Sequence, residues 1–180
     1  MTDLVFKTAR TGELDQATRK IIVDVCVDAF KETEFLNLFS YLRPDHLHVM
    51  AYQSTALVGH AVVSTRWMQP EGQPILRTAY IDAVAVVTAE QKKGIGKAVM
   101  QQVASVITDY QIAGLQTDVP AFYESVGWEL WCGALAGRGT NGLIPTPDQK
   151  GVMILRLPKT PPLNLDGLLT IEDQITRIWE

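Results

Sequence analysis

The chain has 180 residues, of which 47% are hydrophobic and 20% charged, and this composition is typical of one globular domain with a well-filled core. Its formal net charge of -4 argues against a nucleic-acid partner, because phosphate binding needs a cationic surface, whereas a small basic substrate fits such a charge well. The two cysteines, Cys26 and Cys132, give neither a disulfide framework nor a metal-type spacing, so a reducing compartment is expected.

The N-terminal residues and the hydropathy pattern bear on localisation. The start, Met1-Thr2-Asp3, has no basic region followed by an apolar run, so no signal peptide is expected. No apolar stretch approaches the length of about 18 residues that a membrane-spanning helix needs. We therefore expect a cytoplasmic protein without a membrane partner.

In chain order, the first elements are a strand, two helices and a hairpin. Residues 4–9 alternate as a strand does, and apolar residues at helical spacing over 21–30 predict a helix. A second, short helix is predicted around residues 35–39. Residues 47–52 and 56–68 read as the two strands of a hairpin.

The middle of the chain predicts a buried strand followed by a helix. Both faces of residues 75–87 are mostly apolar, which indicates a central strand covered on two sides. After a glycine-rich turn, an apolar stripe over 99–110 predicts a helix. A strand at 114–117, a short helix at 120–125 and a strand at 128–131 follow.

The last part of the chain is less regular. Residues 133–148, rich in Gly, Pro and Thr, are predicted to form a long loop, and 151–157 the final strand. The order of strands and helices predicts an α+β fold, without the strict alternation of a Rossmann fold. We expect one domain over residues 1–157, with residues 158–180 as a C-terminal extension that packs on the same domain.

The strongest chemical signal is the glycine-rich turn between the buried strand and its helix. Such a turn exposes successive backbone N–H groups, and the following helix start adds partial positive charge, so the turn can bind an anion. Gly94 and Gly96 allow close backbone approach, and three lysines lie beside them. The alternative is a solvated lysine-rich helix cap, since G-x-G alone is weak. The combination of buried strand, short connection, Q-x-x-G-x-G loop and amphipathic helix favours the anion site.

That combination resembles motif A of the GNAT superfamily of N-acetyltransferases, and Phe122–Trp128 looks like the family's later aromatic signature. The resemblance implies a GNAT fold, a mixed and mostly antiparallel twisted sheet flanked by helices. It also implies acetyl-CoA as co-substrate and no metal. By position it assigns the pantetheine-binding strand to Val84, Ala85 and Val86, and the pyrophosphate cradle to Gln91, Lys92, Lys93, Gly94, Ile95, Gly96 and Lys97.

A second resemblance, to the aminoglycoside 2′-N-acetyltransferases, runs in patches along nearly the whole chain. It rests on the stretches 47–51, 59–61, 80–82 and 146–148 and on an aromatic residue near the C-terminus. This resemblance implies that the acceptor is an amine, with a role in antibiotic resistance if that amine is an aminoglycoside. The substrate-binding residues it implies are Asp82, Thr117, Asp148 and Trp179.

Acetyl transfer to an amine needs a polarised acyl carbonyl, a deprotonated amine and a reprotonated thiolate. The Val86 backbone N–H is the candidate for the first task and Tyr123 for the last; the alternative for Tyr123 is a packed aromatic on a short helix. Asp82 is the one charge in its apolar strand, where the aminoglycoside enzymes carry a glutamate thought to relay the proton through water. Its alternative is a carboxylate at a bulge that faces solvent or Arg77.

The three histidines are not predicted to bind metal. His46 and His48 are expected to share a strand face, but no third ligand is apparent. Strand packing with one hydrogen bond each is favoured for these two residues and His60. Trp128 and Trp131 are expected in the core and in a pocket wall.

Two departures leave the acceptor open. Arg177 stands where the aminoglycoside enzymes have an aspartate, and Glu180 extends the chain past Trp179. We therefore predict an N-acetyltransferase that moves an acetyl group from acetyl-CoA to a primary amine of a small molecule, with the aminoglycoside 2′-amino group as one candidate. The alternatives are another amine or a protein acceptor, or a non-catalytic acyl-CoA-binding module. A homodimer is also left open.

Overall fold

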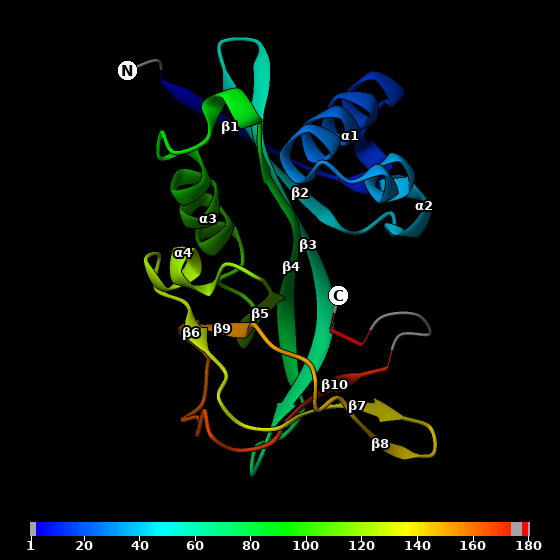
Figure 1. Ribbon diagram of the computed structural model, residues 1–180, viewed down its shortest axis with the longest axis vertical. Coiled ribbons are helices and arrows are strands. Elements are labelled where there is room, and N and C mark those ends of the chain that lie inside the picture. Colours follow the sequence, from blue (N-terminus) through cyan, green and yellow to red (C-terminus); the bar gives the residue numbers. More distant parts are fainter. Residues whose placement is uncertain (1–2, 174–177, 180) are drawn as a thin grey trace. The chain divides into compact units, whose positions relative to one another are not determined.

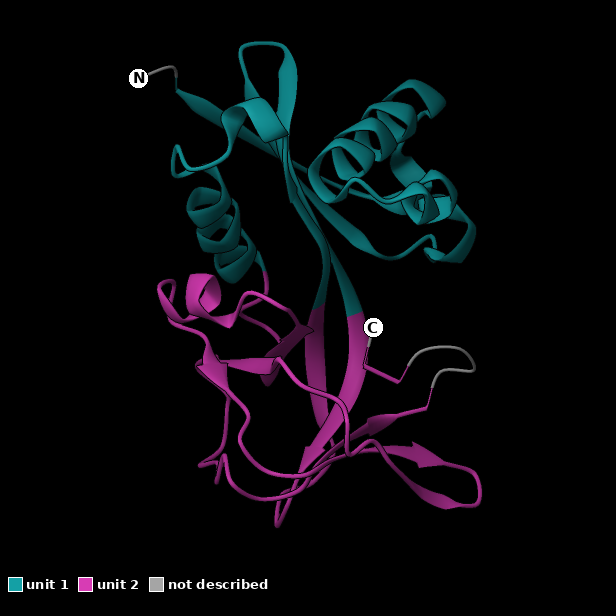
Figure 2. Ribbon diagram, viewed as in Figure 1, with its two compact units in different colours: residues 1–64, 81–106 teal, residues 65–80, 107–180 magenta. Residues whose placement is uncertain are grey.

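The computed structural model describes residues 3–173 and 178–179, so the predictions made for Arg177 and Glu180 lie outside the described residues. The chain divides into two compact units, which Figure 2 colours separately. Unit 1 comprises Met1–Ser64 and Ile81–Val106, and unit 2 comprises Thr65–Tyr80 and Ile107–Glu180. The chain passes from one unit to the other within the long strands β3 (Ala56–Pro70) and β4 (Leu76–Val86).

The strands of unit 1 are β1 (Leu4–Arg10), β2 (Leu47–Gln53) and the unit 1 parts of β3 and β4. Antiparallel pairing joins β1 to β2 and β2 to β3. The predicted hairpin is confirmed: Gln53 pairs with Ala56, and Ser54 in the two-residue turn has a φ of 57°. Positive φ in such a turn matches the twist of the flanking strands.

Helices cover both faces of the unit 1 strands. Helix α1 (Gln16–Phe30) begins after Asp15, whose carboxylate accepts the Thr18 N–H at 2.7 Å, and ends at Lys31 in the left-handed conformation. A 3-10 turn (Thr33–Asn37) and α2 (Leu38–Tyr41) follow it, as predicted for this region. Helix α3 (Ile95–Val106) lies on the other side of the strands from α1 (Figure 1).

The sequence alternation of β2 explains these two faces. Consecutive strand residues point to opposite faces of a sheet. Met50 belongs to the buried cluster that includes Ile22 and Cys26 of α1. Its neighbour Ala51 lies instead beside Gly59, at the face where α3 packs. A Cβ on Gly59 would lie 2.9 Å from a methyl carbon of Val99, so glycine permits the close approach of α3.

Unit 2 holds the larger part of the sheet, in the order β6-β9-β5-β4-β3-β10-β7-β8. Besides β3 and β4, its strands are β5 (Ile112–Gln116), β6 (Glu129–Leu130), β7 (Leu135–Gly139), β8 (Gly142–Pro145), β9 (Val152–Arg156) and β10 (Leu169–Glu172). The β4–β5 and β10–β7 pairs are parallel, and the β10–β3, β5–β9, β6–β9 and β7–β8 pairs are antiparallel. The predicted central place of β4 is confirmed.

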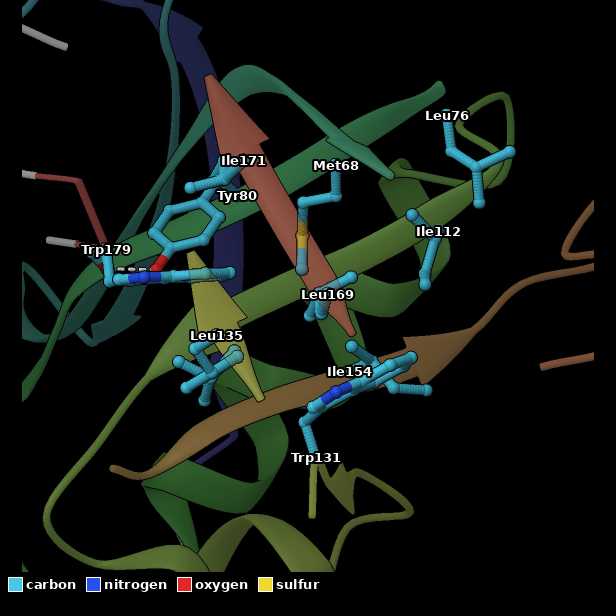
Figure 3. Close-up of a cluster of buried hydrophobic side chains, with 11 residues drawn as sticks. Met68, Leu76, Tyr80, Ile112, Trp131, Leu135, Ile154, Leu169, Ile171 and Trp179 are labelled. Atoms are coloured by element: carbon cyan, nitrogen blue, oxygen red, sulfur yellow. Dashed lines mark hydrogen bonds between the residues drawn. The ribbon is translucent and has the colours of Figure 1, made fainter. Parts of the chain in front are cut away.

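The core of unit 2 gathers aromatic and aliphatic side chains from most of these strands (Figure 3). The indole N–H of Trp131 donates to the Gly167 carbonyl at 2.9 Å, which satisfies the one polar group of this buried ring. Gly114 leaves room for Met68, whose sulfur would lie 2.7 Å from an added Cβ. Trp131 is therefore a core residue.

Three sequence-based expectations were wrong in the second half of the chain. Residues 133–148 are not a long loop, because β7 and β8 form a hairpin within them. The glycines that suggested a loop allow this tight turn, with Gly142 at a φ of 116°. Likewise β9 is not the final strand, since β10 follows. The apolar stripe over residues 99–110 predicted a longer helix than the structure has, because α3 ends at Val106.

None of the described helices is both long and apolar enough to cross a membrane. The predicted boundary between residues 1–157 and 158–180 stays a prediction. The described part of 158–180 lies in unit 2, where β10 inserts between β3 and β7.

Candidate functional site

In unit 1, the end of β4 and the turn after it are tightly anchored. The Val87 N–H donates to the Val58 carbonyl at 3.0 Å, and the Gln91 side-chain amide donates to the Val86 carbonyl at 3.1 Å. The Asp28 carboxylate of α1 accepts the Thr88 N–H at 2.6 Å. This bond holds the pKa of Asp28 at about 2, well below its ordinary value. The connection therefore has a defined conformation ahead of the glycine-rich turn.

The glycine-rich turn curls because two of its residues are left-handed. Lys92 has a φ of 62° and Gly94 a φ of 86°. The first helical bond of α3 runs from the Ala98 N–H to the Gly94 carbonyl at 3.0 Å, so the N–H groups of residues 95–97 lie ahead of it. A helix start of this kind favours an anion.

The lysine side chains of this turn would also attract an anion. Lys92, Lys93 and Lys97 are exposed, and Lys93 forms an ion pair with Glu90 at 3.1 Å. Ile95 is buried beneath the turn, and Gly96 lies in the first turn of α3. The structure thus brings the whole predicted pyrophosphate cradle, residues 91–97, into one turn at the start of a helix.

Upstream of the turn, β4 carries the predicted strand residues and Asp82. Ala85 is buried, and Val84, Val86 and Asp82 are half-buried. Ala83 has a φ of 49°, a left-handed conformation that is rare for alanine within a strand. The backbone of the strand is therefore kinked beside Asp82. The role of Asp82 stays a prediction.

Tyr123 belongs to unit 2, on the short helix α4 (Pro120–Glu124). Its ring is 7% exposed and lies edge-on to Phe122 and Trp128, at centroid distances of 4.9 and 6.2 Å. Its carbonyl accepts the Trp128 N–H at 3.1 Å, and Gly127 between them has a φ of 93°. The aromatic neighbours hold the Tyr123 ring in one place. This packing is compatible with both alternatives for Tyr123, a structural aromatic residue and a general acid held in position.

Three of the predicted substrate residues lie around one open pocket of unit 2. The pocket has a volume of about 610 Å³ and is lined by Gln116, Asp118, Pro145, Thr146, Pro147, Asp148, Gln149 and Lys150. Thr117 is buried between two lining residues, and its N–H donates to the Gly151 carbonyl at 2.9 Å. The Trp179 indole N–H donates to the Thr146 hydroxyl at 3.0 Å. Asp82, the fourth, belongs to unit 1.

The buried histidines His48 and His60 make more hydrogen bonds than the sequence pattern predicted. His46 precedes β2 instead of sharing its face with His48. His48 and His60 contact each other at 2.9 Å between Nδ1 and Nε2, and each ring has a further hydrogen-bond partner, so the expectation of one bond each was wrong. The alternation of β2 and β3 was the signal that could have found the pair, because His48 and His60 are diagonal neighbours on the paired strands. Within residues 3–173 and 178–179, no three His, Cys, Asp or Glu side chains are grouped to hold a metal ion.

Residues 16–128 match the model of the acetyltransferase (GNAT) family. The chain belongs to this family. It is 30% identical to an aminoglycoside 2′-N-acetyltransferase of Mycolicibacterium fortuitum, over 97% of this chain and 93% of that protein. The chain is therefore a GNAT N-acetyltransferase.

Solved structures support the predicted fold. A GNAT family N-acetyltransferase (YhbS) of Escherichia coli, solved in complex with CoA, has a TM-score of 0.65 at 15% identity and covers 98% of this chain and 94% of its own. Escherichia coli ElaA has a TM-score of 0.58 at 15% identity, over 86% of this chain and 100% of its own. The α+β GNAT fold predicted from the sequence is confirmed.

Proposed function

We propose that this GNAT enzyme transfers the acetyl group of acetyl-CoA to a primary amine of a small molecule. The observation that carries the proposal is the turn at residues 91–97, where a left-handed glycine, a helix start and exposed lysines meet. The pyrophosphate of coenzyme A is an anion of the kind that such a turn binds. The family relationship and the CoA complex of YhbS agree with this assignment.

In the proposed reaction the amine nitrogen attacks the thioester carbonyl, a C–N bond forms and the C–S bond breaks. The Val86 N–H would polarise the carbonyl, as backbone donors do for developing oxyanions. Asp82 would take the amine proton, through a water molecule if the distance requires it, and Tyr123 would protonate the departing thiolate. Each role rests on the family resemblance and can be tested by mutation.

The first acceptor to test is an aminoglycoside, at its 2′-amino group. This choice is supported by the relative from Mycolicibacterium fortuitum and by the pocket of unit 2, which presents the carboxylates of Asp118 and Asp148. Carboxylates attract a polycation, although Lys150 in the same lining reduces the net negative charge. The absence of a nucleic-acid partner and the formation of a homodimer stay predictions.

Thiol release from acetyl-CoA, followed across a panel of amines that includes aminoglycosides, tests the proposal. We expect turnover with at least one small amine. Tyr123→Phe should lower kcat about 100-fold, the usual size of a general-acid contribution, and leave coenzyme A binding unchanged. Phe122→Leu, on the same helix, serves as the packing control. Coenzyme A binding without turnover of any amine would indicate the non-catalytic module instead.

The pocket residues are tested separately. Asp148→Asn should raise the KM for a polycationic acceptor and leave the KM for acetyl-CoA unchanged, because Asp148 lines the pocket and is not one of the cradle residues 91–97. Gln149→Ala, at the neighbouring lining position, removes a neutral group and is the matched control. Equal effects of the two variants would remove Asp148 from the acceptor site.

A further inference from the structure

A line of buried side chains in unit 1 ends on the backbone of β4. The Thr11 hydroxyl lies 2.8 Å from His48 Nε2, His48 Nδ1 lies 2.9 Å from His60 Nε2, and His60 Nδ1 lies 3.1 Å from the Ala83 carbonyl oxygen. Both histidine side chains are fully buried, and Thr11 is 4% exposed. The reaction proposed above uses none of these three side chains.

The last acceptor of the line fixes the direction of every bond in it. A carbonyl oxygen only accepts, so His60 Nδ1 carries a proton and donates it to Ala83. In the neutral ring His60 Nε2 is then an acceptor, which requires a proton on Nδ1 of His48. His48 Nε2 in turn accepts from the hydroxyl of Thr11, whose other approach, to the His46 carbonyl, is longer at 3.3 Å.

Both rings are neutral at the pH of ordinary assays. Burial lowers the pKa of His60 to about 4, and burial together with the neighbouring His60 lowers the pKa of His48 to about 3. The thiol of Cys26, 3.8 Å from His60 Nδ1, stays protonated because burial raises its pKa to about 12. The line therefore keeps one set of tautomers, which suits it to hold a group in place.

The backbone of Ala83, whose carbonyl accepts the last hydrogen bond of this line, is strained. Ala83 has a φ of 49°, a left-handed conformation in which the Cβ of an L-residue crowds the carbonyl oxygen that follows it. Such strain persists only where the surroundings over-determine it. Because a peptide bond is planar and trans, a bond that fixes the Ala83 carbonyl toward His60 also turns the Val84 N–H away from His60.

We propose that His60, aligned by His48, is a positioning residue that holds the Ala83–Val84 peptide in the orientation that acetyl transfer uses. The peptide joins Ala83 to Val84, so its orientation sets the direction of the Val84 N–H and fixes the kink that follows Asp82. Donation to the carbonyl also polarises the amide and strengthens the Val84 N–H as a donor. This inference rests on the proposed function, which assigns Asp82 to the site, and on the family resemblance, which places Val84 in the pantetheine-binding strand.

Two substitutions at position 60 separate this role from simple core packing. The amide nitrogen of Asn and Nδ1 of His are both two bonds from Cβ, whereas the amide nitrogen of Gln matches Nε2. His60→Asn therefore keeps the donor to Ala83, and His60→Gln displaces it. We expect His60→Gln to lower kcat/KM for acetyl-CoA about tenfold, as loss of one hydrogen bond would, and His60→Asn to lower it by less than about threefold.

Ala83→Gly supplies a rescue that a merely structural role would not show. Glycine adopts a positive φ without the Cβ penalty, so the kink at position 83 persists when the hydrogen bond from His60 is lost. The double variant His60→Gln/Ala83→Gly should recover most of the lost kcat/KM. His60→Gln/Ala79→Gly is the matched control, since Ala79 lies in the same strand and is not among the residues with positive φ.

The experiment combines acetyl-CoA kinetics, coenzyme A calorimetry and NMR of the ligand-free variants. NMR should find the proton on Nδ1 of both wild-type rings, and the Ala83 carbonyl ¹³C signal should move in His60→Gln but not in His60→Asn. A proton on Nε2 of His60, equal kinetics for the Asn and Gln variants, or equal rescue by Ala83→Gly and Ala79→Gly would each overturn the inference. Failure of the wild-type chain to bind coenzyme A would instead count against the proposed function. The Ala83 carbonyl signal would still show whether the hydrogen bond from His60 to Ala83 exists.

Discussion

The hydroxyl of Tyr80 donates a hydrogen bond to the carbonyl oxygen of Trp179, and both rings are fully buried in the core of unit 2 (Figure 3). The indole of Trp179 donates to Thr146 of the pocket lining, and the guanidinium of Arg66 donates to the Ile178 carbonyl at 2.8 Å. The described residues near the C-terminus are therefore part of the unit 2 core and reach its pocket.

Tyr80→Phe should destabilise the protein. The substitution leaves the buried Trp179 carbonyl without its donor, at a cost of about 1–3 kcal/mol in the free energy of unfolding. It should also raise the KM for the acceptor, because Trp179 contacts Thr146. Urea denaturation measures the first effect and thiol-release kinetics the second. Tyr110→Phe, which removes a half-buried hydroxyl bonded to Thr65, is the control, and an equal loss in both variants would contradict the special role of Tyr80.

Gly59→Ala should push α3 away from β3. The added Cβ would lie 2.9 Å from Val99 and 3.1 Å from Ile95, a clash that typically costs about 1–3 kcal/mol of stability. Because α3 begins at the cradle, coenzyme A should also bind more weakly. Gly12→Ala, whose Cβ would meet its nearest atom at 3.4 Å, is the control. If the clash is the cause, the substitution costs less in a Val99→Ala background, and an undiminished cost would contradict it.

Gly94→Ala should weaken coenzyme A binding. Gly94 has a φ of 86° in open space, so the obstacle to a side chain is backbone strain alone. Alanine would pay roughly 1–2 kcal/mol to keep this turn, which corresponds to a rise of about tenfold in Kd. Asparagine tolerates the left-handed region better, so Gly94→Asn should bind more tightly than Gly94→Ala. Calorimetry with coenzyme A measures the three affinities. Indistinguishable affinities of the wild type, Gly94→Ala and Gly94→Asn would contradict the assignment of this turn as the pyrophosphate cradle.

Stability should fall as the pH drops below about 6.5. The folded chain holds the pKa of His60 at about 4 and that of His48 at about 3, below the ordinary 6.5, so the unfolded chain takes up protons first. The contribution of the two rings is complete above about pH 6.5 and is lost progressively down to about pH 3. At about pH 5 the loss is about 2 kcal/mol for each histidine. Urea denaturation at about pH 7 and about pH 5 measures it, and an equal slope in a His48→Asn/His60→Asn variant would exclude these rings as the cause.

Local sequence signals were sufficient for much of this molecule. The apolar strand over residues 75–87 and the lysine-rich G-x-G turn predicted both the central place of β4 and the helix start that follows it. The spacing of glycine and lysine is local, and so is the geometry it produces. The predicted cradle at residues 91–97 therefore appears in the structure as one turn.

Features that depend on strand pairing were beyond the sequence pattern. The line from Thr11 to Ala83 joins four separate segments, and only the register of β2 against β3 brings His48 and His60 together. The left-handed Ala83 has no local signal, because alanine does not mark a kink as glycine does. Strand β10 was missed because its pairing partners, β3 and β7, are distant in the chain.

Acetyl transfer to a small amine can be measured by thiol release from acetyl-CoA, with the purified chain, an aminoglycoside that has a free 2′-amino group, and a panel of other small amines. We expect release of coenzyme A that depends on an amine, is saturable in both substrates and falls about 100-fold in Tyr123→Phe. No turnover above the rate of acetyl-CoA hydrolysis with any amine would contradict it.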